Sequence, residues 1–472
     1  MRIFERVQSK LKWSKRRYVG LILGMFALSY VSSAVYQTLK PLPEGLSVET
    51  PLRYANVKFV ADTVQKHQIF DEMLSMIDEA QTTIVLDMFL FNSEVGKSTQ
   101  PQRAMTQELT QALIKKKKIN PNISITVITD PINSVYGGVV PEHYIQLRRA
   151  GIDLMETNLS VLRASNPAWS GFWYLCCQVQ NNPQAGWLTN PFGQEKVTLR
   201  SYLNLLNFKA NHRKTLTVDT TQGWKALVTS QNTHDGSSHH DNVGVVVQGA
   251  TAVDVMRSEQ PVAKMSEGDV PMIVVGQKDG DKQLPQVQLL TEKAIYNAVL
   301  NTINNAQAND QLDLVMFYLS ERQIVEALKC AHQRGVKLRI LLDPNKDAFG
   351  HQKSGIPNRQ VASELHQAGI NVRWCDTHGE QCHSKMMIKH HAQQAEMILG
   401  SANYTARNLK NYNLESDIRV VGTAVQPVFV DAQQYFDTKW TTTSVDYAKY
   451  ADESTSKYWL YRFMEWSGIS TF

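Results

Sequence analysis

Two short stretches of the sequence carry the same set of side chains, and that set can act on a phosphate group. His212 and Lys214 are separated by one residue, and His383 and Lys385 repeat this spacing later in the chain. If each pair lies on a β-strand, side-chain alternation puts its His and Lys on one face. A Ser-x-Asn triplet follows each pair: Ser230 to Asn232, and Ser401 to Asn403. Two such sets in one chain predict that a pair of His and a pair of Lys converge on one phosphate.

The chemistry open to these residues is cleavage or transfer of a phosphodiester. A neutral imidazole attacks phosphorus near pH 7, and a second imidazolium protonates the leaving oxygen. Attack by the imidazole forms a covalent intermediate, which divides a difficult reaction into two easier steps. Two Lys side chains would neutralise the non-bridging oxygens as charge develops. We expect Asn232 and Asn403 to donate further hydrogen bonds, and Ser230 and Ser401 to support the same loops.

The repeated pattern resembles the phospholipase D superfamily, whose signature is His-x-Lys-x4-Asp followed by Gly-Ser-x-Asn, present twice. The first copy includes the motif Asp, Asp219, but Thr229 replaces the Gly of the second half. The second copy has Gly400, but His390 stands where the motif Asp belongs. The resemblance covers residues 60 to 440, and is nearest to the bacterial cardiolipin synthase and phospholipase-like branch.

The resemblance implies roles for individual residues. His212 is the nucleophile that forms a phosphohistidine and His383 is the general acid, although the pseudo-symmetry also permits the reverse assignment. Relatives hold each imidazole with a carboxylate about 30 residues after the motif His, and here Asp241 and Glu415 occupy such positions. Loss of the motif Asp at residue 390 would affect mainly local support. The superfamily reaction needs no metal and no cofactor.

An internal repeat must position these groups, and the sequence contains one. The apolar strand at 83–90 has a counterpart at 312–318, and the strand at 125–131 has one at 338–344. A helix ending in Ala-Gly-Ile follows each second strand, and its Gly is typical of a helix C-cap. Strand–helix alternation predicts an α/β fold. We therefore expect two pseudo-symmetric α/β repeats, each a mixed sheet flanked by helices, packed to form one shared active site.

The expected domain boundaries follow from this repeat. They are an N-terminal segment and linker at 1–45, a first repeat at 46–254, a linker at 255–290, a second repeat at 291–440 and an aromatic C-terminal segment at 441–472. The first repeat carries an aromatic-rich insert at about 157–205. We interpret the insert as a packed subdomain, with an acyl-chain entrance or a membrane-interface loop as the alternative. The C-terminal segment is likewise expected to dock on the core, or else to form an interfacial helix.

The N-terminus has the pattern of a membrane anchor. Seven Lys or Arg lie within residues 1–17, and no charged residue occurs at 18–39. This is long enough to span a bilayer, and the basic flank predicts a cytoplasmic N-terminus with an exported body. We expect a single span in a bacterial-type inner membrane. Small residues at 32–34 make export after signal cleavage the alternative.

The bulk composition leaves lipid and nucleic acid open as partners, because the formal charge is only +5. The basic run at 115–118 is typical of a solvated helix end, so we expect a phospholipid substrate and a membrane rather than nucleic acid. A superfamily nuclease and a non-catalytic, membrane-associated binding protein are the two alternatives. Cys375 and Cys382 would form a disulfide if the body faces an oxidising compartment. The sequence predicts no oligomeric state.

Overall fold

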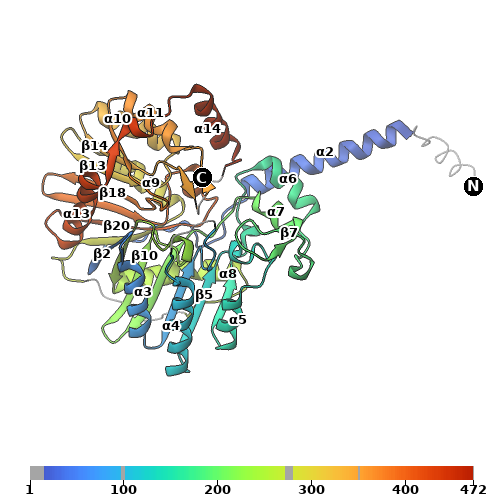
Figure 1. Cartoon of the computed structure of the whole chain (residues 1–472), viewed down its shortest axis with the longest axis horizontal. Coiled ribbons are helices and arrows are strands. Elements are labelled where there is room, and N and C mark those ends of the chain that lie inside the picture. The colour runs from blue at the N-terminus through green and yellow to red at the C-terminus, as the bar shows by residue number, and fades with distance from the viewer. Residues whose placement is uncertain (1–14, 97–100, 272–279, 349–350, 471) are drawn as a thin grey trace, which may run out of the picture.

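The computed structural model describes residues 15–96, 101–271, 280–348, 351–470 and 472. Two α/β lobes pack against each other, and helix α2 (Lys15–Leu39) projects away from them (Figure 1). Each lobe is built on one large mixed sheet with helices against it. The expected fold class is therefore confirmed.

The sheet of the first lobe has eight strands in the order β3-β2-β11-β10-β9-β4-β5-β6. Strands β4, β5 and β6 run parallel, and β4 pairs antiparallel with β9, the strand that follows the first His-x-Lys motif. The strands are β2 (Val57–Thr63), β3 (Lys66–His67), β4 (Thr83–Met88), β5 (Ser124–Thr129), β6 (Asp153–Glu156), β9 (Lys214–Thr220), β10 (Gly223–Thr229) and β11 (Asn242–Gln248).

The sheet of the second lobe has nine strands in the order β1-β12-β20-β19-β18-β13-β14-β17-β21. Its seven inner strands repeat the directions and the order of the first sheet from β2 to β6. The strands are β1 (Arg53–Tyr54), β12 (Gln286–Thr291), β13 (Gln311–Met316), β14 (Lys337–Leu342), β17 (Asn371–Cys375), β18 (Lys385–His391), β19 (Gln394–Gly400), β20 (Ser416–Thr423) and β21 (Ser444–Asp446).

Amphipathic helices bury one face against each sheet. Helix α10 (Arg322–Gln333) shows the local reasons for its position: the Glu321 carboxylate caps it by accepting from the Ile324 amide at 2.9 Å. Its buried residues recur with helical spacing and join the core of the second lobe. The helices on the two sheets are α3 (Gln68–Glu79), α4 (Met105–Ile119) and α5 (Glu142–Arg149), then α9 (Lys293–Asn304), α10 and α11 (Asn358–Gln367).

Besides the core of each lobe, an apolar cluster lies where the two lobes meet. It joins side chains of β2, β10 and β11 to side chains of β18, β19 and β20. Helix α8 (Ala250–Met265) contacts strands of both sheets, and helix α13 (Pro427–Thr442) crosses to β2 of the first lobe. Burial of both inner faces fixes the two sheets relative to each other and brings their strand ends together.

The expected linker at 255–290 needs correction. Helix α8 continues to Met265 and buries Val255, Met256 and Val262 in the core, and β12 begins at Gln286. The charge, Gly and Pro of this region indicated a loop, but tertiary packing holds a helix there even with Pro261 inside it. Part of the range, 272–279, lies outside the described residues.

The insert and the C-terminal segment are ordered additions to the repeats. The insert contains α6 (Pro167–Cys176), a short hairpin of β7 (Leu188–Thr189) and β8 (Lys196–Val197), and α7 (Leu199–Leu205). Helix α6 packs along α2. The C-terminal segment adds β21 to the edge of the second sheet and ends in α14 (Thr455–Ser467), which contacts α11.

Candidate active site

Each His-x-Lys motif lies where its strand begins. Lys214 is the first residue of β9 and Lys385 is the first residue of β18, so each His comes two residues before its strand. Each lysine ammonium donates to the carbonyl of its own motif His, at 2.6 Å in the first motif and 2.8 Å in the second. The two motifs therefore have the same local conformation.

An aromatic ring packs against each motif at equivalent positions. Phe89 directly follows β4, and its ring lies 4.7 Å from the His212 ring and 4.8 Å from the Lys214 ammonium. Phe317 directly follows β13 and lies 4.8 Å from the His383 ring and 5.1 Å from the Lys385 ammonium. Such contacts orient an imidazole and favour a cation. Both rings directly follow the repeated apolar strands, and this repeat is the sequence signal for them.

The two motifs meet at one cavity of about 1020 Å³. His212 and His383 both line it, together with Asn232 and Asn403, the ends of the two Ser-x-Asn triplets. The Oδ1 atom of Asn403 is buried without a hydrogen-bond partner among the described residues. Lys214 lies close enough to Lys385 for its charge to lower the pKa of Lys385. The structure thus brings together the predicted His, Lys and Asn pairs.

Burial of these groups shifts their protonation. It lowers the pKa of Lys214 to about 7, against opposing attraction from Glu415, and it lowers the pKa of Lys385 well below its usual range. Burial first, and then the charges of the lysines, hold the pKa values of His212 and His383 well below 6.5. A bound phosphodiester anion favours the charged form of every one of these groups. Substrate binding and protonation are therefore coupled at this site.

The lobes exchange backbone contacts at the motifs, and this determines which residue supports which imidazole. The amide of His212 donates to the Leu414 carbonyl of the second lobe at 2.9 Å. In the same way the amide of Asp241 donates to the Gln381 carbonyl, two residues before His383, at 3.0 Å. Each motif thus lies beside the opposite lobe. The first motif is next to the residue that follows Leu414, and the second motif is next to the residue that follows Asp241.

Glu415 supports the first imidazole. Its carboxylate lies 3.0 Å from Nδ1 of His212, although the two residues belong to different lobes. The carboxylate also accepts from Ser401 and Asn408, and burial raises its pKa well above the usual range. Because Nδ1 is engaged, Nε2 of His212 remains for the cavity.

Asn242 supports the second imidazole. Its amide oxygen lies 3.0 Å from Nδ1 of His383 and also accepts from the Ser230 hydroxyl at 3.0 Å. Its amide nitrogen donates to the His240 carbonyl at 3.0 Å, which fixes the orientation of the amide. An amide oxygen only accepts, so the proton of neutral His383 is on Nδ1 and the lone pair is on Nε2. Ser230 and Ser401 were expected to support their loops. Their hydroxyls donate to the side chains of Asn242 and Glu415, respectively.

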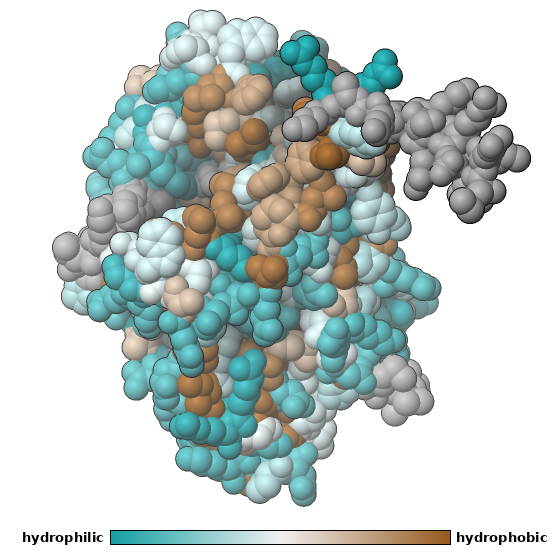
Figure 2. Space-filling view, turned by 90° about the vertical axis from the view of Figure 1, so that its right-hand side faces the viewer, coloured by the Kyte–Doolittle hydropathy of each residue, from teal (hydrophilic) through white to brown (hydrophobic). Residues whose placement is uncertain are grey.

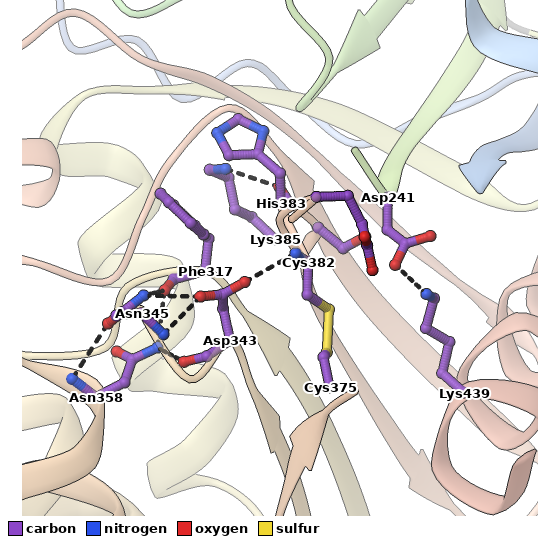
Figure 3. The surroundings of a disulfide bond; sticks show 12 residues. Asp241, Phe317, Asp343, Asn345, Asn358, Cys375, Cys382, His383, Lys385 and Lys439 are labelled. Atoms are coloured by element: carbon purple, nitrogen blue, oxygen red, sulfur yellow. Dashed lines mark hydrogen bonds and ion pairs between the residues drawn. A yellow bond between two sulfur atoms is a disulfide. The ribbon is translucent and has the colours of Figure 1, made fainter. Parts of the chain in front are cut away.

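The expectation for Asp241 needs correction. Its carboxylate pairs with Lys439 of α13, and no hydrogen bond joins it to an imidazole in the described part of the chain (Figure 3). Neighbouring side chains on extended backbone point to opposite sides. Because Asn242 faces His383, Asp241 faces away from it. The spacing predicted that Asp241 holds His212 and that Glu415 holds His383. Instead Glu415 holds His212, and the group that supports His383 is the neutral amide one residue after Asp241.

One further carboxylate holds the chain just before each motif His. Asp130 accepts from the backbone amide of Asn211 at 2.7 Å, and Asp343 accepts from the amide of Cys382 at 2.8 Å (Figure 3). Both are fully buried, and each follows the second parallel strand of its lobe. The repeated Asp-Pro after those strands was the sequence signal for them. A disulfide also ties Cys382 to Cys375 at the end of β17.

Asp219, the motif Asp of the first copy, lies at the far end of β9. It accepts from the amides of Thr82 and Thr83 at 2.9 and 2.7 Å, and so fixes the start of β4. His390 at the matching place contacts Gln433 of α13 at 2.7 Å instead. Neither residue lines the cavity, so the structure places both in support of the sheets.

Comparison with known proteins gives consistent matches. A family described as "Cardiolipin synthase, PLD-like domain" matches residues 299–440. The chain is 30% identical over 104 residues to a human mitochondrial cardiolipin hydrolase and 29% identical over 104 residues to its mouse counterpart. Each match covers 22% of this chain but only 36% and 42% of the relatives.

A solved structure resembles nearly the whole chain. The crystal structure of phosphatidylserine synthase from Haemophilus influenzae Rd KW20 aligns with a TM-score of 0.57, and the alignment covers 89% of this chain and 95% of that chain. Sequence identity is 10%, so this likeness concerns the fold. The alignment extends over both lobes, whereas the family match lies in the second lobe alone.

Proposed function

Because the chain belongs to the phospholipase D superfamily, we propose that it is an enzyme that cleaves or transfers the phosphodiester of glycerophospholipids through a phosphohistidine. The observation that carries this proposal is the shared cavity. Two imidazoles from different lobes line it, each with Nδ1 engaged and Nε2 left for substrate. One nucleophile and one proton donor are what such a double displacement requires.

In the proposed first step, Nε2 of His212 attacks the lipid phosphorus and the bond to the leaving alcohol breaks. His383, an imidazolium when the phosphodiester anion is bound, gives its Nε2 proton to that alcohol oxygen, while Lys214 and Lys385 stabilise the charge on the non-bridging oxygens. In the second step His383 takes a proton from the acceptor, and the acceptor oxygen displaces His212. Water as the acceptor gives phosphatidic acid. The glycerol head of phosphatidylglycerol as the acceptor gives cardiolipin.

The cavity wall favours a lipid over a nucleic acid. Apolar side chains from both the repeat and the insert form much of it, including Leu90, Ile132, Val135, Phe192 and Leu205. Its charged lining is mixed: Glu94, Asp130, Glu142, Glu195 and Asp235 against Lys209, Lys353 and Arg407. A nucleic-acid groove instead needs a continuous basic surface to follow the backbone.

Helix α2 supplies the proposed membrane anchor. Arg16–Leu39 is long and apolar enough to cross a bilayer by length and composition, and none of its most apolar window is buried in the protein. With the basic N-terminal flank on the cytoplasmic side, the body lies outside the cytoplasm. The buried disulfide between Cys375 and Cys382 fits an oxidising compartment.

A lipid-product assay tests the proposal. The full chain in vesicles is incubated with labelled phosphatidylglycerol, with and without added glycerol, and the products are separated. Cardiolipin or an exchanged head group is expected for transfer, and phosphatidic acid alone for hydrolysis. No turnover of phospholipid alongside activity on single-stranded DNA would overturn the proposal in favour of a nuclease.

A further inference from the structure

We infer that the insert and helix α14 form a bilayer-facing surface. The body of the protein then contacts the lipid head-group region directly, in addition to its attachment through the anchor helix. We call this surface the membrane face and define it by Phe172 and Leu175 of α6 and Trp459, Phe463 and Trp466 of α14. The inference rests on the proposed membrane span but not on the proposed chemistry. The partner is a phospholipid bilayer.

The length of α2 that is free of the body is the first observation. Tyr30 of α2 donates its hydroxyl to the Ala168 carbonyl of α6 at 2.8 Å, and Gly171 lies so close to α2 that an added Cβ would approach Ala34 within 2.9 Å. Only residues 18–29 of the uncharged stretch precede this contact. Twelve helical residues extend about 18 Å, whereas a bilayer core is about 30 Å thick. A complete span must therefore draw α6 to membrane depth.

The composition of the insert is the second observation. From residue 164 to residue 194 the sequence contains no Asp, Glu, Lys, Arg or His, in a chain that is 20% charged overall. Within that stretch Phe172, Leu175 and Trp187 have exposed fractions of 41%, 44% and 67%. A water-facing loop of this length ordinarily carries several charges, and large exposed apolar patches mark interaction sites.

Helix α14 extends the same surface. It docks through one face only, where the buried Tyr461 contacts Arg322 and Ser320 of the second lobe. Trp459, Phe463 and Trp466 recur at helical spacing on its other face and are exposed, with Trp466 at 82%. The residue after α14, Gly468, packs against Ser165 just before α6.

Figure 2 views the molecule from the side on which α2 leaves the body, and apolar side chains gather around α2 on that side. Aromatic residues beside an apolar helix suit the boundary between head groups and acyl chains. The insert also forms part of the cavity wall through Phe192 and Leu205. The same element thus contacts the anchor and the cavity, which gives a lipid a short route between them.

Photolabelling of the full chain tests this inference without requiring turnover. The protein is reconstituted in vesicles of phosphatidylethanolamine and phosphatidylglycerol that contain a phospholipid with a diazirine in its acyl chain. After illumination, the expected adducts lie in α2, in α6 and in α14. Ile119 and Val425, which are 67% and 82% exposed elsewhere on the body, are the internal controls and should carry none.

A double variant sharpens the result. Phe172→Asp with Leu175→Asp should lose the α6 adducts and keep those of α2, because charged side chains are expelled from hydrocarbon. Ile119→Asp with Val425→Asp is the matched control, and it should keep every adduct. An unchanged melting temperature in detergent shows that each variant is folded.

The outcomes separate this inference from the proposed function. Adducts in α2 alone would overturn the membrane face. Absence of adducts even in α2 would overturn both the span and the membrane face. Adducts in all three helices without turnover of phospholipid would support the membrane face while contradicting the proposed chemistry.

Discussion

The two halves of the active site repeat one hydrogen-bond plan and differ in the residue that supports each imidazole. In each half a serine hydroxyl and a backbone contact from the opposite lobe hold the group that supports a His. That group is the Glu415 carboxylate behind His212 and the Asn242 amide behind His383. The position of the supporting residue is the same in both repeats, and its residue type gives the two imidazoles different environments.

This difference supports the assignment of roles. A phosphohistidine carries positive charge on its ring, which a carboxylate at Nδ1 stabilises. A neutral amide fixes the tautomer without favouring the imidazolium, so its His gives up a proton more readily. We therefore expect His212 to be the nucleophile and His383 to be the general acid. Enzymes commonly assign the acid role and the base role to two groups of the same type by placing them in different environments.

The largest expected effect comes from removing each imidazole in turn. On phospholipid, His212→Ala should lower turnover by about 10⁶-fold, and His383→Ala by about 10²–10⁴-fold. A phosphodiester with a nitrophenol leaving group needs no general acid in the first step, so it should restore the first-turnover burst of nitrophenol in His383→Ala but not in His212→Ala. The measurement is turnover on phospholipid and the nitrophenol burst on the activated substrate, with melting temperatures as the control for folding. Restoration in His212→Ala instead would exchange the two roles.

The middle residues of the two motifs offer the next comparison. Arg213 is buried between Glu259 and Glu292, at 3.1 and 2.7 Å, whereas Ser384 shares one hydrogen bond with Tyr435 at 2.7 Å. Arg213→Met leaves two buried carboxylates without their partner and should lower the free energy of unfolding by about 3–5 kcal/mol. Ser384→Ala should lower it by about 0.5–1.5 kcal/mol.

Urea titration of both variants measures the difference. Equal losses would mean that the two motifs are supported to the same extent, contrary to this contact pattern.

Exchanging the supporting groups tests the central difference directly. Asn242→Asp puts a carboxylate against Nδ1 of His383 and should raise the pKa of that imidazole. A general acid acts while protonated, so the basic limb of the kcat/KM profile should move to higher pH. Glu415→Gln should move the acidic limb to lower pH, because neutral His212 then persists to lower pH.

The pH profile distinguishes these effects from simple damage. Asp241→Asn is the matched control, since it alters the neighbouring carboxylate that pairs with Lys439 and should leave both limbs in place. A basic limb that stays fixed in Asn242→Asp would contradict the role of His383 as the acid.

Features set by local spacing could be predicted from the sequence. The His-x-Lys pairs, the Ser-x-Asn triplets and the repeated strands all appear as short patterns, and the structure confirms the two α/β repeats. The positions of Asp130 and Asp343 were visible as a repeated Asp-Pro, but their task depends on which backbone amide lies opposite. That information is tertiary.

The crossed support could not be predicted for the same reason. Glu415 and Asn242 reach their imidazoles only because each motif lies beside the opposite lobe. Counting residues from each His selected Asp241, one position from Asn242, and a shift of one on extended backbone reverses the side that a residue faces. The helix within the expected linker was missed because part of its apolar packing is tertiary, against residues distant in sequence such as Val85 and Ile128.

The smallest expected effect concerns the motif Asp and its replacement. Asp219→Ala removes the acceptor for two amides at the start of β4 and should lower the free energy of unfolding by about 1–3 kcal/mol. His390→Ala removes one half-buried contact with Gln433 and should cost at most about 1 kcal/mol. Asp219 lies five strand residues from Lys214, about 17 Å away. Both variants should therefore keep full turnover at a temperature below their melting points, and lost activity in a folded Asp219→Ala protein would show that this residue acts on the site after all.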